Sequence, residues 1–116
     1  MKLTNYKFGQ VEIDNILYTQ DFIICGEDII SNWRRESGHN LSIKDLEKVF
    51  EFDPNILIIG TGKSGMMEVS PEIIKEIESR RIEVRFYPTK EAIKIYNKYI
   101  EITNILIISG CFHLTC

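Results

Sequence analysis

A glycine-rich turn that directly follows a buried strand is the feature of this sequence best suited to chemistry. The apolar run Ile56–Ile59 leads into the turn. The residues of the turn are Gly60, Thr61, Gly62, Lys63 and Ser64. Exposed backbone amides at the carboxyl end of a strand can hold a small anion or metabolite, so we predict a ligand-binding site here, with Lys63 assisting. The structural alternative is a turn whose glycines only let the backbone fold over the strand end.

The same letters match the pattern G-x-G-x-x-G, but the arrangement that a dinucleotide requires is missing. Gly65 should open a helix whose amides meet the pyrophosphate, whereas the capped helix begins only near Ser70. The next strand ends in Tyr87-Pro88-Thr89, without the acidic residue that would bind a ribose. The spacing of a phosphate-binding loop is also absent. We therefore expect no nucleotide and no other cofactor.

A second group of residues combines an indole ring, guanidinium groups and an imidazole. Trp33 and Arg34 are followed by Arg35 and, four residues later, by His39. Such side chains recognise carboxylates or partner proteins, because Trp and Arg are frequent interface anchors. We predict that Trp33, Arg34 and His39 lie at the rim of the site formed by the turn. The alternative is that Trp33 caps the core and the arginines are solvated.

The C-terminal residues Cys111, His113 and Cys116 place three soft metal ligands within six positions. Zinc or copper could use two or three of them, with His39 or Cys25 completing the set. The sequence contains no C-x-x-C pair, and the simpler interpretation is that these residues alternate on a terminal strand. We therefore predict no metal site.

Composition and charge exclude several classes of function. The net charge is −3 and the charges are interspersed, so the chain lacks the basic face of a nucleic-acid-binding protein. No apolar run approaches the ~20 residues of a membrane span, and no signal peptide is evident. We expect a cytoplasmic protein that binds neither nucleic acid nor a membrane. Nucleophile elbows, paired-histidine metal motifs and kinase signatures are absent from the sequence.

The N-terminal half of the chain is predicted to begin with β-structure and to end with a helix. Short apolar stretches up to Cys25, with turn residues at Asp14 and Asn15, predict antiparallel strands joined by a hairpin. One or two helical turns are expected between residues 27 and 40, where apolar residues recur at roughly helical spacing. An apolar stripe that follows Ser42 predicts a helix that stops at Asp53.

The C-terminal half is predicted to form a β-α-β-α-β unit. The expected strands are Ile56–Ile59, Ile82–Tyr87 and Ile105–Ile108, and the helices between them begin near Ser70 and Thr89. Strands that alternate with helices in this way pair in parallel. The predicted fold is one α/β domain over residues 1–116, a three-layer arrangement with a central mixed, mainly parallel sheet and added N-terminal antiparallel hairpin strands.

Residues spread along the chain resemble those of a small α/β domain family of unknown function. That family includes the adipogenesis-associated domain protein and the mitochondrial assembly factor three of respiratory complex I. The residues that carry the resemblance are Tyr6, Phe8, Gly9, Ile13, Asp14, Tyr18, Asp21, Trp33, Arg34, Arg35, Gly38, His39, Gly60, Thr61, Gly62, Gly65, Met66, Met67, Thr89, Ala92, Tyr96, Asn97, Phe112, His113, Leu114, Thr115 and Cys116. The resemblance implies a three-layer α/β fold and, from the mitochondrial members, a role in protein contacts rather than catalysis.

Together, the residues and the resemblance favour a non-enzymatic protein-interaction or assembly module over an enzyme. Its ligand groove is expected at Gly60–Gly65. The alternative is a small-anion or metabolite-binding protein, or an enzyme, that uses the same turn. One or more proteins are the expected partners. A homo-oligomer is a further hypothesis, because short strands can leave a sheet edge unpaired.

Overall fold

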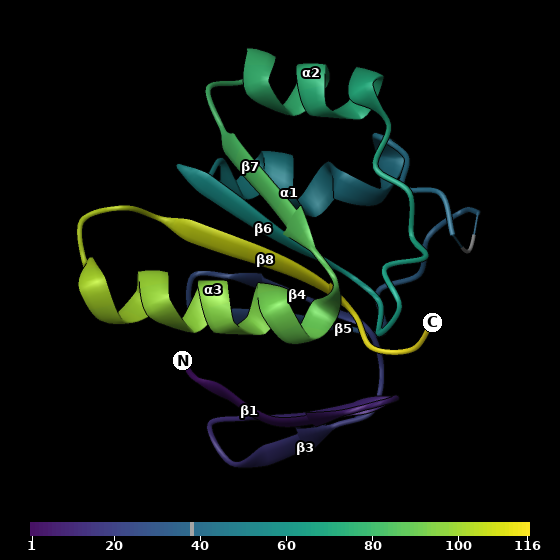
Figure 1. The fold of residues 1–116 in the computed structure, drawn as a ribbon. Helices are drawn as coiled ribbons and strands as arrows, with labels where there is room; N and C mark the ends of the chain where they lie inside the picture. The colour runs from purple at the N-terminus through teal and green to yellow at the C-terminus, as the bar shows by residue number, and fades with distance from the viewer. Residues whose placement is uncertain (38) are drawn as a thin grey trace.

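The computed structural model describes residues 1–37 and 39–116, and within them the chain forms two β-sheets and three α-helices (Figure 1). The smaller sheet has the order β1 (Leu3–Lys7), β2 (Gln10–Ile13), β3 (Ile16–Tyr18). The larger sheet has the order β5 (Asp28–Ser31), β4 (Phe22–Cys25), β8 (Ile108–His113), β6 (Ile56–Thr61), β7 (Glu83–Tyr87). The helices are α1 (Glu47–Phe52, preceded by the 3-10 turn Lys44–Leu46), α2 (Pro71–Ser79) and α3 (Thr89–Ile102). Gly38, one of the residues that carry the family resemblance, lies outside the described residues.

The predicted β-α-β-α-β unit is present, with β6 in the middle. Strand β6 pairs in parallel with β7 on one side and with β8 on the other. Helix α2 begins as predicted, because the Ser70 hydroxyl accepts a hydrogen bond from the Ile73 amide and Pro71 occupies the first turn. The prediction that the last strand spans Ile105–Ile108 is wrong. Strand β8 begins only at Ile108, and residues 105–107 form an exposed connection.

The larger sheet is mixed rather than mainly parallel. Strands β4 and β5 pair antiparallel, and β4 also pairs antiparallel with β8, so half of the four pairings are parallel. The helical turns expected between residues 27 and 40 are replaced by β5. The reason is a hairpin in which Gly26 has a φ of +63° and Ile29 lies opposite Ile24. The apolar residues of this segment therefore pair across strands instead of lining one side of a helix.

The hairpin predicted at Asp14 and Asn15 is confirmed. Both residues have positive φ values, 49° and 69°, which suit a tight turn between β2 and β3. The N-terminal antiparallel strands were predicted as additions to the main sheet. Strand β4 extends the larger sheet, where it is completely buried between β5 and β8, and strands β1 to β3 form the smaller sheet that packs on it.

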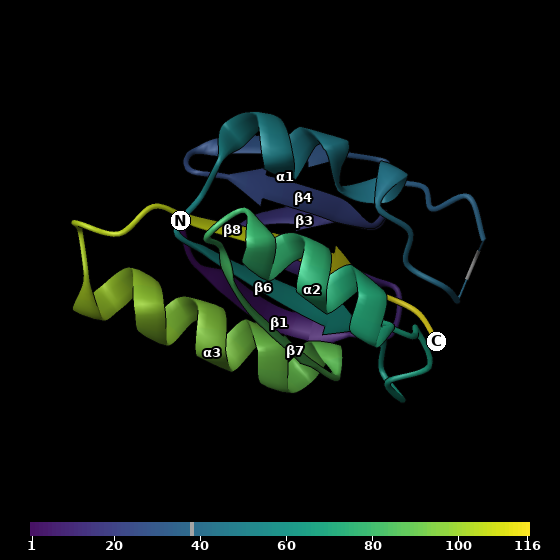
Figure 2. The ribbon, with the colours of Figure 1, turned by 90° about the horizontal axis from the view of Figure 1, so that it is seen from above.

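Each face of the larger sheet is covered, which Figure 2 shows from above. On one face, side chains from α3 and from the smaller sheet pack into a core with Phe112 and Tyr96 at its centre. On the other face, α1 and α2 cover a second core that contains Leu57, Cys111 and Trp33. The strands between the two cores are buried on both sides, which explains the continuous apolar runs of β4 and β6. Among the described residues, no helix is long and apolar enough to cross a membrane.

Candidate functional site

The glycine turn lies where β6 ends, and its backbone amides are bonded within the chain. The Gly62 amide donates to the Thr89 hydroxyl (2.8 Å), and the Lys63 amide donates to the Thr115 carbonyl (2.9 Å). The Gly65 amide donates back to the Gly62 carbonyl (3.2 Å). The amides that we expected to face a ligand at Gly62 and Lys63 are therefore already satisfied.

The C-terminal segment of the chain occupies the position beside this turn. Helices α2 and α3 flank β6 on opposite faces of the sheet, and the carboxyl ends of β6 and β8 lie side by side (Figures 1 and 2). In open α/β sheets such a point commonly forms the ligand crevice. Here a Cβ atom on Gly62 would lie only 2.7 Å from the Cys116 carbonyl oxygen and 2.8 Å from that of Thr115. Glycine at position 62 thus serves the close approach of the chain's own C-terminal segment.

Thr89, at the start of α3, joins the turn to the end of β8. Its hydroxyl accepts the Gly62 amide and donates to the His113 carbonyl. The Thr89 amide in turn donates to the Gly62 carbonyl (2.9 Å). Thr89 is fully buried. One side chain therefore fixes β6, β8 and α3 to one another at this end of the sheet.

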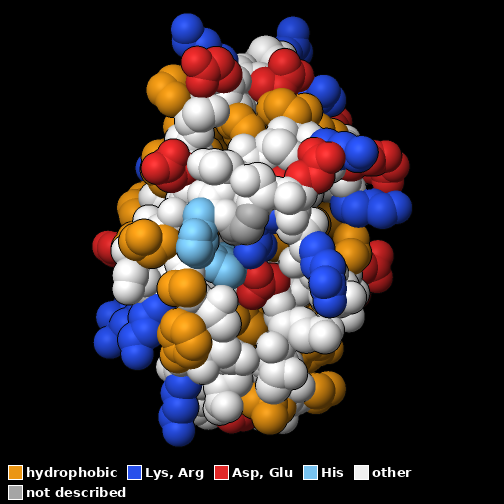
Figure 3. Space-filling view, turned by 90° about the vertical axis from the view of Figure 1, so that its right-hand side faces the viewer, with side chains coloured by type: hydrophobic (Ala, Val, Ile, Leu, Met, Phe, Trp, Pro, Cys, Tyr) orange, Lys and Arg blue, Asp and Glu red, His pale blue; other side chains and the backbone are white. Residues whose placement is uncertain are grey.

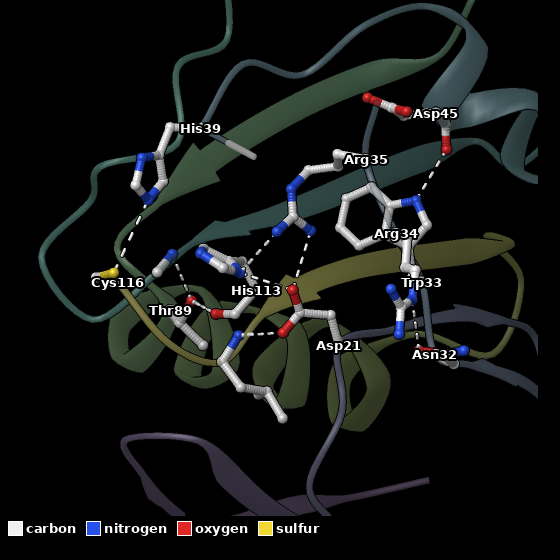
Figure 4. A network of polar contacts seen from close by, with 12 residues as sticks. Asp21, Asn32, Trp33, Arg34, Arg35, His39, Asp45, Thr89, His113 and Cys116 are labelled. Atoms are coloured by element: carbon white, nitrogen blue, oxygen red, sulfur yellow. Dashed lines mark hydrogen bonds and ion pairs between the residues drawn. The ribbon is translucent and has the colours of Figure 1, made fainter. Parts of the chain in front are cut away.

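A buried polar network lies next to this junction (Figure 4). Asp21, just before β4, accepts hydrogen bonds from the Arg35 guanidinium (3.0 Å), from His113 Nδ1 (2.7 Å) and from the Leu114 amide (2.8 Å). The side chains of Arg35 and His113 are each 7% exposed, and that of Asp21 is 15% exposed. The structure therefore brings together three charged or titratable groups from segments far apart in the sequence.

The protonation state of the network follows from these contacts. Burial acts to raise the pKa of Asp21, but the hydrogen bonds from His113 and Leu114 and the nearby charges of His113 and Arg35 outweigh it, so the pKa is lowered. An ionised carboxylate only accepts hydrogen bonds, so the contact with Asp21 requires a proton on His113 Nδ1. Arg35 Nη2 lies 3.0 Å from the same nitrogen and, as a donor, requires a lone pair there, so Nδ1 serves one of these two contacts at a time. His113 Nε2 is buried and has no hydrogen-bond partner among the described residues.

Trp33 and Arg34, which were predicted at the rim of the turn, line hollows to which no residue of the turn contributes. Trp33 is only 7% exposed, its indole N–H donates to the Asp45 carbonyl (3.0 Å), and the Arg35 guanidinium lies 5.0 Å from its ring centroid. Arg34 is exposed and donates from Nε to Asn32 Oδ1 (3.3 Å). It lines two shallow hollows of about 350 and 520 Å³, neither of which includes residues of the turn. Trp33 thus packs against the Arg35 guanidinium and leaves only 7% of its surface exposed, although it lines the same two hollows as Arg34.

His39 does lie close to the turn and to the C-terminal segment. Its carbonyl accepts the Glu68 amide (2.6 Å), and its Nε2 lies 3.8 Å from the Cys116 sulfur. The rings of His39 and His113 meet edge to face with centroids 6.2 Å apart. In Figure 3 the two histidines, in pale blue, lie side by side on the face toward the viewer. His39 is therefore the member of the second predicted group that the structure places beside the turn.

The three candidate metal ligands of the C-terminus do not converge. Cys111 is completely buried in the core beneath α1 and α2, and burial raises its pKa well above the usual value. Cys116 is exposed. In the described parts of the chain, no group of three or more histidine, cysteine or acidic side chains is arranged to hold a metal ion.

An open hollow of about 580 Å³ lies on the other side of the turn. Its walls come from the turn, from the segment that leads to α2 and from the end of β7. The residues that line it are Thr61, Ser64, Gly65, Met67, Glu68, Val69, Ser70, Pro71, Phe86, Tyr87 and Pro88. Phe86 lies on the wall of the hollow and is 42% exposed. Met66, which stands between the lining residues Gly65 and Met67 in the sequence, is 53% exposed. Of the turn residues predicted to bind a ligand, Thr61 and Ser64 line this hollow, and Gly60, Gly62 and Lys63 do not.

The sequence did not point to Asp21 or Thr89 as site residues. Asp21 precedes a buried strand and lies 92 positions from His113, so no local spacing signals the pair. Thr89 reads as an ordinary residue at the start of a helix, and only the approach of β6 reveals its second role.

Comparison with known proteins yields a family match and several similar structures. Residues 3–104 match the model of a family described as a protein of unknown function (DUF498/DUF598). A crystal structure of a conserved hypothetical protein from Pyrococcus horikoshii is 32% identical, with a TM-score of 0.82 and full coverage of both chains. The protein named MT938 is 23% identical (TM-score 0.79, covering 99% of this chain and 98% of that chain). A Mth938-like domain from Bordetella pertussis is 13% identical (TM-score 0.70, covering 97% and 85%). The last two comparisons concern the fold alone.

Proposed function

The chain belongs to the DUF498/DUF598 family of proteins of unknown function, as its resemblance to a small α/β family predicted, and within that family we propose that it is a non-enzymatic protein-interaction or assembly module. Its binding surface is the hollow beside the Gly60–Gly65 turn. The partner is a protein segment that presents apolar side chains to this hollow.

The observation that carries the proposal is the character of the hollow. Its walls combine apolar residues, among them Val69, Pro71 and Phe86, with polar ones, and the apolar part makes up the larger share of its accessible surface. The polar residues are Thr61, Ser64, Glu68, Ser70 and Tyr87. Open apolar surface of this kind marks sites of protein or ligand binding more often than bare solvent contact. The hollow is wide and open rather than enclosed, which suits a side chain of a partner better than a small molecule that must be surrounded.

The state of the charged groups argues against a catalytic role. Asp21 accepts three hydrogen bonds, and two of its donors, Arg35 and His113, are themselves almost completely buried. A general acid or base must reach the proton it transfers. In this network His113 Nδ1 is engaged with its neighbours, and His113 Nε2, the nitrogen that could act on a substrate, is closed off from solvent, so the arrangement supports the fold rather than a reaction.

The alternative function, binding of a small anion or metabolite by the turn, has weaker support. Its premise was a set of exposed amides, whereas the amides of Gly62, Lys63 and Gly65 donate within the chain. The exposed Lys63 side chain remains available, but a single lysine on a surface is a weak anion site. Titration with inorganic phosphate, followed by the chemical shifts of the turn amides, tests this alternative directly.

The interaction proposal is tested by cross-linking and capture from native lysate with the wild type and four variants. Ser64→Trp changes an exposed residue that lines the hollow, and Met66→Asp changes the exposed residue between the lining residues Gly65 and Met67. Both variants should therefore lose the captured partner while folding normally. Ile105→Asp is the matched control, because Ile105 is 85% exposed in the α3–β8 connection, away from the hollow. Wild-type capture by both hollow variants, or loss of the partner with Ile105→Asp alone, contradicts the proposal. Arg34→Ala tests in the same assay the surface that the sequence had suggested.

A further inference from the structure

Strand β7 forms one edge of the larger sheet, and its outer side is unusually open. It pairs only with β6 in the described residues. Three of its five residues are exposed, whereas every residue of β6 and β8 is buried. Figure 1 shows β7 at the margin of the sheet, with α2 and α3 to either side. An edge of this kind is a template for another strand unless it is blocked.

The backbone groups that face outward can be assigned from the pairing with β6. The Glu83 amide donates to the Asn55 carbonyl (2.9 Å), toward β6. Because backbone groups alternate along a strand, Arg85 also faces β6, and Val84 and Phe86 direct their N–H and C=O groups to the open edge. A strand added here must therefore bond to Val84 and Phe86.

The side chains of β7 alternate between the two faces of the larger sheet, so an added strand meets one set of them on the α2 side and the other set on the α3 side. Val84 packs toward the core under α2. Arg85 and Tyr87 line a groove with residues of α3, so Glu83 and Arg85 share the α3 side. They form an ion pair along the strand (2.8 Å) with side chains 51% and 43% exposed.

We infer that β7 is a homodimerisation edge, and that it pairs antiparallel with β7 of a second copy in a register centred on Val84. In that register Val84 lies opposite the second copy's Val84, and both donate and accept across the two-fold axis. Glu83 of each copy lies opposite Arg85 of the other, which creates two symmetric pairs of opposite charge. Phe86 lies beside Ile82 of the second copy, so part of its exposed ring becomes covered.

The charges of Glu83 and Arg85 also disfavour the neighbouring registers. Only shifts by two residues keep Val84 and Phe86 bonded across the edge. A shift in one direction places Glu83 opposite Glu83, and a shift in the other places Arg85 opposite Arg85. Like charges directly opposite each other destabilise a strand pair, whereas opposite charges stabilise it. The order Glu-Val-Arg is thus self-complementary in one antiparallel register.

This inference shares Phe86 with the proposed binding hollow, but its test changes only Glu83 and Arg85, which do not line that hollow. Sedimentation velocity of the full chain from ~1 µM to ~1 mM should reveal a dimer with a dissociation constant on the order of 10–100 µM, as expected for a small interface. Glu83→Arg and Arg85→Glu should each weaken dimerisation about 10- to 100-fold, because both symmetric pairs become repulsive. The controls Glu27→Arg and Lys7→Glu reverse exposed charges on other strands or turns and should leave the constant unchanged.

Mixing the two single variants separates contacts between copies from the ion pair within one strand. The Glu83→Arg chain carries two positive charges on its edge, and the Arg85→Glu chain carries two negative ones. An equimolar mixture should therefore form a heterodimer at least as tight as the wild-type dimer, although each variant alone dimerises about 10- to 100-fold more weakly. A wild-type chain that stays monomeric at ~1 mM, a dimer unaffected by both reversals, or a mixture that stays monomeric would each overturn the inference.

Discussion

Replacing Asp21 by asparagine should destabilise the protein more than any other isosteric change of a carboxylate in the chain. Asparagine keeps the shape but has one acceptor oxygen and one donor NH2 group. The Arg35 guanidinium, His113 Nδ1 and the Leu114 amide all donate to Asp21. Whichever way the asparagine amide is oriented, at least one of these donors then faces another donor.

The expected magnitude follows from the contacts that are lost. Hydrogen bonds to a charged group contribute about 1.5–3 kcal/mol each, and breaking a buried ion pair on one side costs about 3–5 kcal/mol. Asp21→Asn loses the charge that Arg35 and His113 both contact, so we expect a loss of about 3–5 kcal/mol in the free energy of unfolding at pH 7. Urea unfolding measures this loss, and the melting temperature should fall by ~10–20 °C.

The pH dependence of the free energy of unfolding provides a second, independent test. The pKa of Asp21 in the folded state lies below its ordinary value of 3.8. The ionised carboxylate therefore contributes stability that is fully present above that value and is lost as the pH falls through the lower folded pKa. The difference in stability between wild type and Asp21→Asn should be largest near neutral pH and should narrow below about pH 4.

The control for this experiment is Asp28→Asn, at an exposed position in β5. Surface changes of this kind usually stay within about 0.5 kcal/mol. A loss below about 1 kcal/mol for Asp21→Asn at pH 7, or a difference that persists unchanged into acid, would refute the description of Asp21 as the centre of a buried ionised network.

Two further changes test the junction at the glycine turn. Gly62→Ala should lower the free energy of unfolding by about 1–3 kcal/mol or more, because Gly62 has a φ of +103° and a Cβ atom there would meet two carbonyl oxygens. The control is Gly9→Ala. Gly9 has a φ of +81°, and a Cβ atom there would meet only one methyl group, at 3.8 Å, so this variant measures the backbone strain alone. Urea unfolding of both variants should therefore show the larger loss at Gly62, and equal losses would mean that the C-terminal segment does not press on this turn. Thr89→Val should lower the free energy of unfolding by about 1–3 kcal/mol, because the buried Gly62 amide loses its acceptor. Hydrogen exchange of the Gly62 amide should become faster in this variant. An unchanged exchange rate would contradict the role given to Thr89.

The parts of the fold that the sequence predicts correctly are those encoded by neighbouring residues. Ser70 and Pro71 define the start of α2, and Asp14 with Asn15 defines the first hairpin, because each signal acts within a few positions. The wrong predictions concern apolar runs without such a boundary. Ile105 continues an apolar run and reads as part of a strand, yet it is exposed, since strand pairing with β6 starts only at Ile108.

The candidate site was only partly predictable for the same reason. The turn at Gly62 is a local pattern and was found, whereas Asp21 and His113 are joined only by the tertiary fold. Trp33 shows why two interpretations had to stay open, and the structure agrees with the one in which it caps the core. Its residue type suggests an interface anchor, but its burial and its hydrogen bond to Asp45 make it a support for Arg35.

The role of the glycines at the turn decides what kind of recognition this end of the domain can perform. Glycine permits a close approach of backbone to something else, and a sequence alone does not say to what. At Gly62 the approaching atoms are carbonyl oxygens of residues 115 and 116, and the amides of Gly62 and Lys63 find their acceptors inside the chain. Backbone amides at these two positions are thus not available to a ligand, and recognition there has to use side chains. The adjacent hollow offers such side chains, among them the exposed Phe86 and Ser64, and for this reason we propose that its ligand is a segment of another protein.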